Sequence, residues 1–154
     1  MADQEIQVAL QRIYVKDLSF ESPNPVEVFG QNWKPQVNVE MQTRNRKIAE
    51  SAYEVSLEMT ITAKNGEKNA FVIEVEQAGI FVIKGLEGEN LRRLMGTFCL
   101  TILFPYLRET VDSLCLKGSF PPLVLAPINF DQLYEQSMKQ QHQQQQQQPD
   151  QPHA

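Results

Sequence analysis

Few residues in this sequence are suited to acid–base or nucleophilic chemistry. Both histidines, His142 and His153, lie in the glutamine-rich C-terminal segment, so the body of the chain lacks the usual general base and zinc ligand. Cys99 and Cys115 stand sixteen residues apart within apolar sequence, and that spacing is not a metal-ligand pattern. We therefore predict a protein that is not an enzyme and that holds no metal or cofactor.

Carboxylates are the remaining chemically active groups, and many of them fall on one face of predicted strands. Parity puts Asp17 and Glu21 on the same side of an N-terminal strand. If that side points outward, the two residues join other outward acids of the later strands, namely Glu40, Glu54, Glu58, Glu74 and Glu76. One interpretation is a solvated face that keeps the sheet soluble, and the other is an acidic platform for a basic partner. Val72, an apolar contact among these carboxylates, slightly favours the platform.

Charge and the N-terminal sequence exclude further classes of function. A net charge of −5 argues against nucleic acid as a partner, because phosphate binding needs a basic surface. The start MADQEIQVALQ has no secretory signal, and no apolar run approaches the roughly 18 residues of a membrane span. We expect a cytoplasmic protein without membrane insertion, in which both cysteines remain reduced rather than form a disulfide.

Alternating apolar and polar residues predict the sheet that positions the carboxylates. The clearest strand is YEVSLEMTITAK (53–64), and Asn65–Gly66 then predicts a tight hairpin turn into NAFVIEVEQAGIFVI (69–83). QVNVEMQ (36–42) and IYVKDLSFE (13–21) supply two earlier strands, with Val37, Val39 and Met41 facing inward. We predict a four-stranded antiparallel sheet.

Helices follow the strands, which indicates an α+β fold with a long helix and a shorter C-terminal helix on one face of the sheet. The long helix begins near Glu89, and Pro105 either kinks it or starts a second helix. GSFPPLVLAPI (118–128) is an extended connector, and Asn129 is the N-cap of the last helix. We predict a loose N-terminus over 1–9, one domain over 10–139 and a disordered glutamine-rich tail over 140–154.

The predicted long helix carries more apolar surface than one sheet can cover. Apolar side chains of FCLTILFPYLRETV (98–111) span about 240° around the helix axis, whereas a surface helix usually carries a stripe little wider than about 100°. Its own sheet and the last helix can cover both sides, or other subunits can cover the second side. We favour a subunit interface that includes Phe98 and Ile102, because large exposed apolar surface marks a contact.

Apolar residues also occur in the predicted loops. Phe29 and Trp33 lie between the first two strands, and Phe120, Leu123, Leu125 and Ile128 lie in the connector. These residues either anchor the loops on the body or line an exposed apolar groove that accepts many sequences.

Several separate stretches, in the same order, resemble the SecB family of protein-export chaperones. They are RIYVKDLSFESPN (12–24), Trp33, QAGIFVIKGLEG (77–88), ILFPYLRETV (102–111) and FPPLVLAPINF (120–130). The resemblance covers about residues 8 to 138. It implies a homotetramer, a dimer of dimers in which helices lie between two sheets of eight strands. It also implies an ATP-independent holdase that keeps unfolded precursors export-competent and passes them to the ATPase SecA.

The resemblance also implies roles for individual residues. Asp17, Glu21, Val72 and Glu74 match positions that contact SecA, whose zinc-containing C-terminal element is the expected basic partner. Ile73, Val75 and Gln77 match positions involved in tetramer assembly. The client-binding groove is expected near the connector and last helix, with Trp33, Phe104, Tyr106, Phe120 and Leu125 as candidate lining. The C-terminal SecA contact of some family members is not carried over, because this chain has a glutamine tract there.

Two alternative functions remain open at this point. A helix-on-sheet cavity would suit a small-molecule carrier or an oligomeric scaffold. A SecB-like chaperone can also be dedicated to an antitoxin rather than to export, although the acidic face argues for a SecA-type partner.

Overall fold

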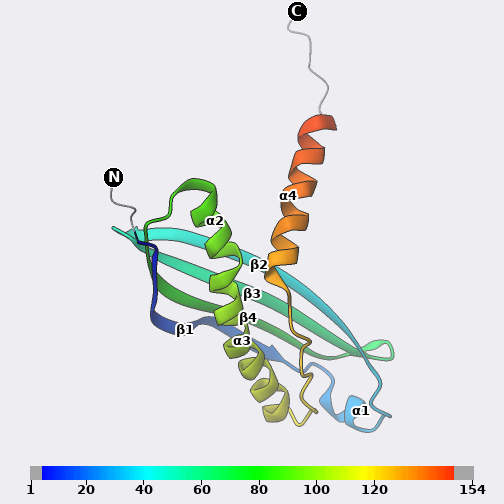
Figure 1. Cartoon of the computed structure of the whole chain (residues 1–154). Coiled ribbons are helices and arrows are strands. Elements are labelled where there is room, and N and C mark those ends of the chain that lie inside the picture. The colour runs from blue at the N-terminus through cyan, green and yellow to red at the C-terminus, as the bar shows by residue number, and fades with distance from the viewer. Residues whose placement is uncertain (1–4, 148–154) are drawn as a thin grey trace, which may run out of the picture.

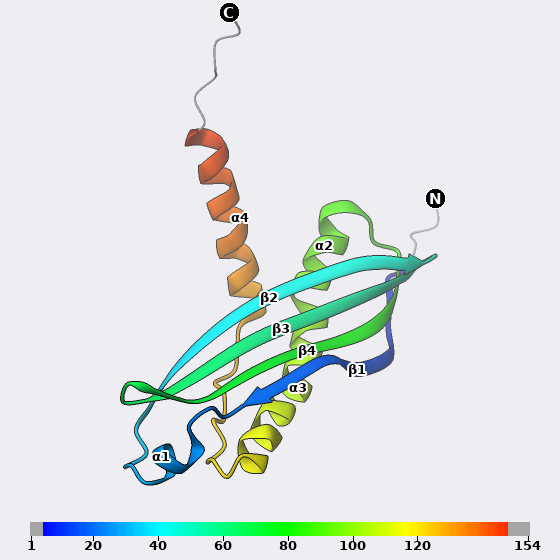
Figure 2. The same ribbon diagram turned by 180° about the vertical axis from the view of Figure 1, so that it is seen from behind.

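The computed structural model describes residues 5–147 as a curved antiparallel sheet with helices on one side (Figure 1). The four strands run in the order β1-β4-β3-β2, which confirms the predicted sheet and the α+β fold class. The elements are β1 (Gln7–Glu21), α1 (Pro25–Phe29), β2 (Pro35–Ala49), β3 (Ala52–Asn65), β4 (Lys68–Lys84), α2 (Gly88–Gly96), α3 (Phe98–Lys117) and α4 (Phe130–Gln147). The view from behind shows the opposite face of the sheet, over which no helix lies (Figure 2).

The β3–β4 hairpin turns where the sequence predicts it. Gly66 has a φ of +67°, a conformation that glycine adopts without strain. Pairing then runs along nearly the whole of both strands, from Asn65 opposite Lys68 to Ala52 opposite Val82.

The core lies between α3 and the middle of the sheet. Inward side chains of β3 and β4 are fully buried, among them Leu57, Ile61 and Phe81, and they pack beneath Leu103 and Leu107 of α3. The helix packs mainly on the two central strands, β3 and β4. The helix-facing sides of the edge strands β1 and β2 are therefore left partly open.

The helical region breaks at Thr97 and continues through Pro105, so the predicted alternative of a second helix that starts at the proline is wrong. Thr97 departs from helical geometry with φ −127° and ψ −74°, and its hydroxyl donates to the Arg93 carbonyl at 2.6 Å. Pro105 lies inside the continuous helix α3 on its exposed side. The carbonyl of Thr101, which a proline leaves without its helical partner, is thus near solvent rather than in the core.

The two ends of the predicted domain also differ from expectation. β1 begins at Gln7, so part of the predicted loose N-terminus is paired with β4. Helix α4 continues to Gln147, where the sequence predicts a disordered tail from residue 140; glutamine is a good helix former. This second half of α4 projects away from the sheet (Figures 1 and 2). The rest of the two predicted segments, 1–4 and 148–154, lies outside the described residues.

Candidate binding surfaces

The structure brings the four predicted SecA-contact residues together on the helix-free face of β1 and β4. Glu21 pairs directly with Val72, and Asp17 pairs with Glu76, two residues beyond Glu74 on the same side of β4. Directly paired residues of antiparallel strands point to the same face, so these side chains form one surface. All three predicted carboxylates are exposed, and Val72 is half-buried among them. We call Asp17, Glu21, Val72, Glu74 and Glu76 the acidic platform.

A β-bulge in β1 lies beside this platform. Val15 is opposite Gln77 and Asp17 is opposite Glu76, so Lys16 is an extra residue with no counterpart on β4. Such an insertion shifts the alternation of the strand by one residue. Tyr14 on one side of the bulge and Asp17 on the other therefore both face outward.

Glu54 of β3 faces outward as predicted, but it is not part of an exposed acidic surface. Only 8 % of the residue is exposed, and its carboxylate accepts hydrogen bonds from Lys16 at 2.8 Å, from Tyr14 and from Arg46 at 3.1 Å. The bonds from Lys16 and Tyr14 outweigh the effect of burial and lower the pKa of Glu54 to about 2. Burial and the bond to Glu54 raise the pKa of Tyr14 to about 12. Glu54 is thus an ionised centre that links β1, β3 and β2.

The residues predicted for tetramer assembly occupy two different places. Ile73, Val75 and Gln77 are buried beneath the helix layer within this chain. Gln77 instead donates through Nε2 to the Tyr14 carbonyl at 3.0 Å, next to the bulge. Phe98 is 47 % exposed on the outer side of α3, with the half-buried Ile102 one turn further along.

Tyr106, a predicted groove residue, lies in line with Phe98 and Ile102 on α3. The three side chains recur every four residues along α3, and Tyr106 is 50 % exposed. We call them the α3 stripe. The helix-facing side of β1 adds further exposed apolar residues, namely Leu10, Val15 and Leu18. The α3 stripe and the helix-facing side of β1 are therefore two apolar surfaces that this chain alone leaves uncovered.

The other predicted groove residues do not line one groove. Trp33 and Phe120 do come together, with ring centroids 5.3 Å apart, and both also pack near Phe71 in the core. Phe104 is buried against Phe130 at the start of α4. Leu125 packs on the core from the connector. Trp33, Phe120 and Leu125 thus anchor the β1–β2 loop and the connector to the body, which is the simpler of the two interpretations of the loop residues.

A groove lies between β2 and α4, near the connector and last helix where the resemblance places one, but with lining residues other than those predicted. Two adjoining hollows of about 650 and 460 Å³ share Met41 of β2 and Leu133 of α4 as lining residues. Val39 lines the second hollow, and Leu100 and Phe130 line the first. Val37, Val39 and Met41 face inward as predicted, yet they remain 37 to 43 % exposed because α3 packs mainly on β3 and β4. We call this the β2–α4 groove.

Helix α4 is held over the groove by polar contacts with α2. The Tyr134 hydroxyl donates to Glu89 at 2.7 Å, and Arg93 lies 2.8 Å from Glu135 with its guanidinium over the Tyr134 ring. The hydrogen bond from Tyr134 is the main cause of a lowered pKa at Glu89, and the same bond raises the pKa of Tyr134. Gly96 allows the Tyr134 ring to pack closely on α2, because it has no Cβ. A Cβ at this position would lie 2.9 Å from a Tyr134 ring carbon.

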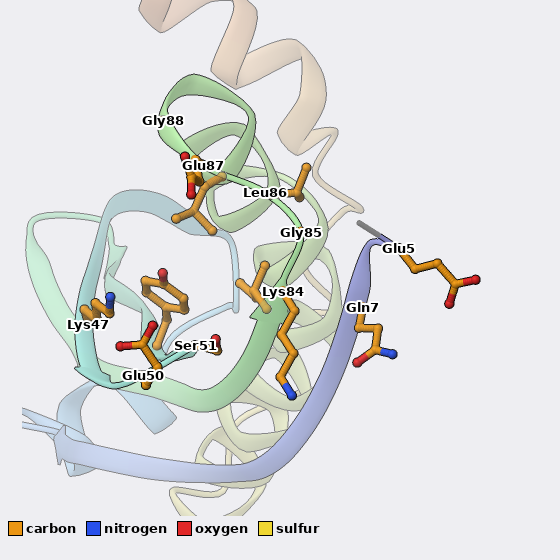
Figure 3. Close-up of a pocket in the computed structure, with 13 residues that line it drawn as sticks. Glu5, Gln7, Lys47, Glu50, Ser51, Lys84, Gly85, Leu86, Glu87 and Gly88 are labelled. Carbon is orange, nitrogen blue, oxygen red and sulfur yellow. The ribbon is translucent and has the colours of Figure 1, made fainter. Parts of the chain in front are cut away.

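A further hollow of about 660 Å³ lies at the end of the sheet and has lysine and glutamate side chains on its rim (Figure 3). Its labelled residues come from the start of β1, the β2–β3 turn and the β4–α2 loop. It is not the helix-on-sheet cavity of a small-molecule carrier, because side chains fill the space between α3 and the sheet. Within residues 5–147 we find no helix able to span a membrane and no cluster of potential metal ligands.

A family model and curated relatives identify the family of this chain. The family model described as preprotein translocase subunit SecB matches residues 1–141. The chain belongs to the SecB family. Protein-export protein SecB of Marinobacter nauticus is 56 % identical over 133 residues, which cover 86 % of this chain and 81 % of that protein. The Hahella chejuensis SecB is 57 % identical over 133 residues, covering 86 % and 84 %. Membership confirms the family predicted from the sequence.

Among solved structures, a SecB-like chaperone of Mycobacterium tuberculosis shares the fold. That protein was solved in complex with a peptide from the HigA1 antitoxin. The TM-score is 0.65 with 20 % identity, and the match covers 79 % of this chain and 91 % of that one. At this identity the likeness concerns the fold alone.

Proposed function

We propose that this SecB-family protein is an ATP-independent holdase that acts in the cytoplasm, binds unfolded precursors and delivers them for export. The observation that carries the proposal is the β2–α4 groove, an apolar surface built around Met41 and Leu133. Burial of client apolar surface there contributes about 25 cal/mol per Å² before entropy costs, with no covalent chemistry required.

The proposed groove suits unfolded chains because it selects for apolar character rather than for one sequence. Met41 is a flexible, polarizable residue that adapts to differently shaped side chains. A client that folds quickly hides its apolar residues and escapes. Selection between clients is then kinetic, a competition between folding and binding.

We further propose that four copies assemble through the α3 stripe and the open side of β1. Both surfaces are apolar and exposed in the single chain, and sheets from different copies would cover them. An assembly of this kind also presents several grooves to one client, so avidity can supply the affinity that a single groove lacks.

Delivery in this proposal is electrostatic. The acidic platform lies on the opposite face of the sheet from the groove, so a basic element of SecA can dock while the client is still bound. The export assignment rests on the identity with export SecB proteins, which exceeds 50 % in two relatives, against 20 % for the antitoxin-bound neighbour.

A comparison of two forms of one precursor tests the holdase. The folding-arrested form should bind much more tightly than the fast-folding mature form, and the double substitution of Met41 and Leu133 by serine should weaken that binding. Val124→Ser serves as the control, because Val124 is an exposed apolar residue of the connector outside the groove. Equal binding of both precursor forms would sink the proposal.

A further inference from the structure

The bulge at Lys16 decides which residues of β1 reach the acidic platform. Asp17 lies opposite Glu76 only because the extra residue precedes it. With uninterrupted pairing, Asp17 would fall opposite Val75 and point into the helix-facing side of the sheet. Leu18 would then point outward into the platform. A single inserted residue therefore puts the carboxylates of Asp17 and Glu21 on one face and the apolar chains of Leu18 and Phe20 on the other.

Two polar side chains support the backbone at this bulge from opposite faces of the sheet. On the helix side, Gln77 donates to the Tyr14 carbonyl, although its own amide oxygen has no hydrogen-bond partner within the described residues. On the outer side, Glu54 accepts from the Lys16 ammonium and from the Tyr14 hydroxyl. A buried amide oxygen without a hydrogen-bond partner costs stability, so an apolar residue at position 77 would suit the core better. Its contact with the bulge gives a reason for its presence.

Small residues make room for the outer half of this arrangement. Ala78 and Ser56 face outward on β4 and β3, yet both are almost fully buried. Their short side chains leave space for the longer chains of Tyr14 and Lys16 to extend across the sheet to Glu54. The contacts of Tyr14 and Lys16 with Glu54 thus depend on the small residues Ala78 and Ser56 in the central strands.

We propose that Lys16, Glu54 and Gln77 form a brace that fixes the β1 bulge and thereby positions Asp17 and Glu21 for the basic partner. This inference rests on the proposed function of the platform. Lys16 is then a positioning residue, although its own positive charge opposes a basic partner. Removing the Lys16 ammonium should therefore change the affinity for a basic partner in two opposite ways. Loss of a like charge should raise the affinity, and loss of the brace should lower it.

The sign of the change in affinity separates these two effects. If charge alone mattered, Lys16→Met would strengthen the binding of a basic partner, because it removes a like charge beside the platform. If the brace positions Asp17, the same substitution weakens binding by at least about threefold, as expected for coupled residues in one network. Arg44→Met is the matched control: Arg44 is an outward cation on β2 that pairs with Glu58 at 3.4 Å and lies outside the bulge.

The experiment is a titration of the full-length protein with SecA and with a synthetic peptide of its zinc-loaded C-terminal element at low salt. We expect weaker binding for Lys16→Met and for Gln77→Leu, which changes no charge, and equal or tighter binding for Arg44→Met. In an Asp17→Asn background the loss caused by Lys16→Met should shrink to within about twofold, because its effect acts through Asp17. Circular dichroism and solution mass establish that each variant remains folded and assembled.

The possible outcomes distinguish this inference from the proposed function. If the wild-type protein binds neither SecA nor the peptide, the platform itself is wrong and the brace has no partner to serve. If the wild-type protein binds and Lys16→Met binds as tightly as Arg44→Met, the platform stands and the brace is overturned. A loss that persists unchanged in the Asp17→Asn background also overturns it. Should Gln77→Leu fail to fold, the sign of the Lys16→Met effect still decides.

Discussion

The hydroxyl of Tyr134 on α4 donates a 2.7 Å hydrogen bond to the carboxylate of Glu89 on α2. Together with the Arg93–Glu135 ion pair, this bond fixes the base of α4 beside the β2–α4 groove. Exposed ion pairs of this kind contribute little to stability, because water and salt screen them. A bound chain can therefore displace these polar contacts of α4, while the buried Phe130 keeps the start of the helix on α3.

Gly96→Ala should loosen α4, because the new Cβ would lie 2.9 Å from the Tyr134 ring and force the two helices apart. We expect both the association and the dissociation rates of an unfolded polypeptide to rise by at least about twofold, since a displaced wall opens the groove but holds its occupant less well. Stopped-flow fluorescence measures both rates. Gly30→Ala is the control, because its Cβ would meet nothing closer than 3.6 Å. Identical rates for Gly96→Ala and the wild type would contradict this account of α4.

Glu54→Gln should destabilise the protein in a pH-dependent way. The folded pKa of Glu54, about 2, lies below its ordinary value of 4.5, so its stabilising contribution is present above about pH 4.5 and is lost as the pH falls toward 2. Urea unfolding at fixed protein concentration gives the free energy of unfolding for both proteins. The difference between them should be largest above pH 4.5 and should shrink below it. A difference that stays constant across this window would show that the ionised carboxylate is not what matters.

Phe98→Asp and Ile102→Asp should reduce the assembly state of the protein. Either change would place a charge in the interface proposed for the α3 stripe, where an unpaired buried carboxylate is strongly unfavourable. Sedimentation velocity would then show a lower mass at a concentration where the wild type is assembled. Val124→Asp adds the same charge at an exposed apolar residue of the connector and should change nothing. If all three variants sediment like the wild type, the stripe is not an interface.

Glu74→Lys should weaken the binding of SecA without releasing clients. The substitution reverses a charge on the acidic platform, and the platform and the β2–α4 groove lie on opposite faces of the sheet. We expect a loss of at least about tenfold in SecA affinity at low salt, with a smaller loss at high salt because screening weakens the wild-type interaction. Unaltered SecA affinity at low salt would refute the platform, whatever the effect on clients.

The sequence predicts the sheet well because its alternation is nearly uninterrupted. β3 and β4 follow the expected pattern from Tyr53 to Ile83. At the Asn65–Gly66 turn, Gly66 adopts the positive φ that a tight hairpin needs. The bulge at Lys16 also leaves a signal in the sequence of β1. Ile13 and Val15 share one parity while Leu18 and Phe20 share the other, and such a phase change within one strand indicates an inserted residue.

Other features depend on contacts that local sequence does not encode. The break at Thr97 directly follows Gly96, the last residue of α2, whereas the proline, a stronger helix breaker in general, lies inside α3 on an exposed side. The β2–α4 groove exists because α3 packs mainly on the central strands, which periodicity along β2 cannot reveal. Gln77 belongs to a family-derived set for assembly, but its hydrogen bond to Tyr14 depends on tertiary register.

Solution mass measured by light scattering, with and without an equimolar unfolded export-type polypeptide, tests the central claim most directly. The account predicts a species of four times the 17.7 kDa chain mass, which gains the mass of one client only when that client is unfolded. A single-chain species that ignores the unfolded polypeptide would contradict both the assembly through α3 and the holdase. A tetramer whose mass never changes would leave the assembly standing and refute the holdase.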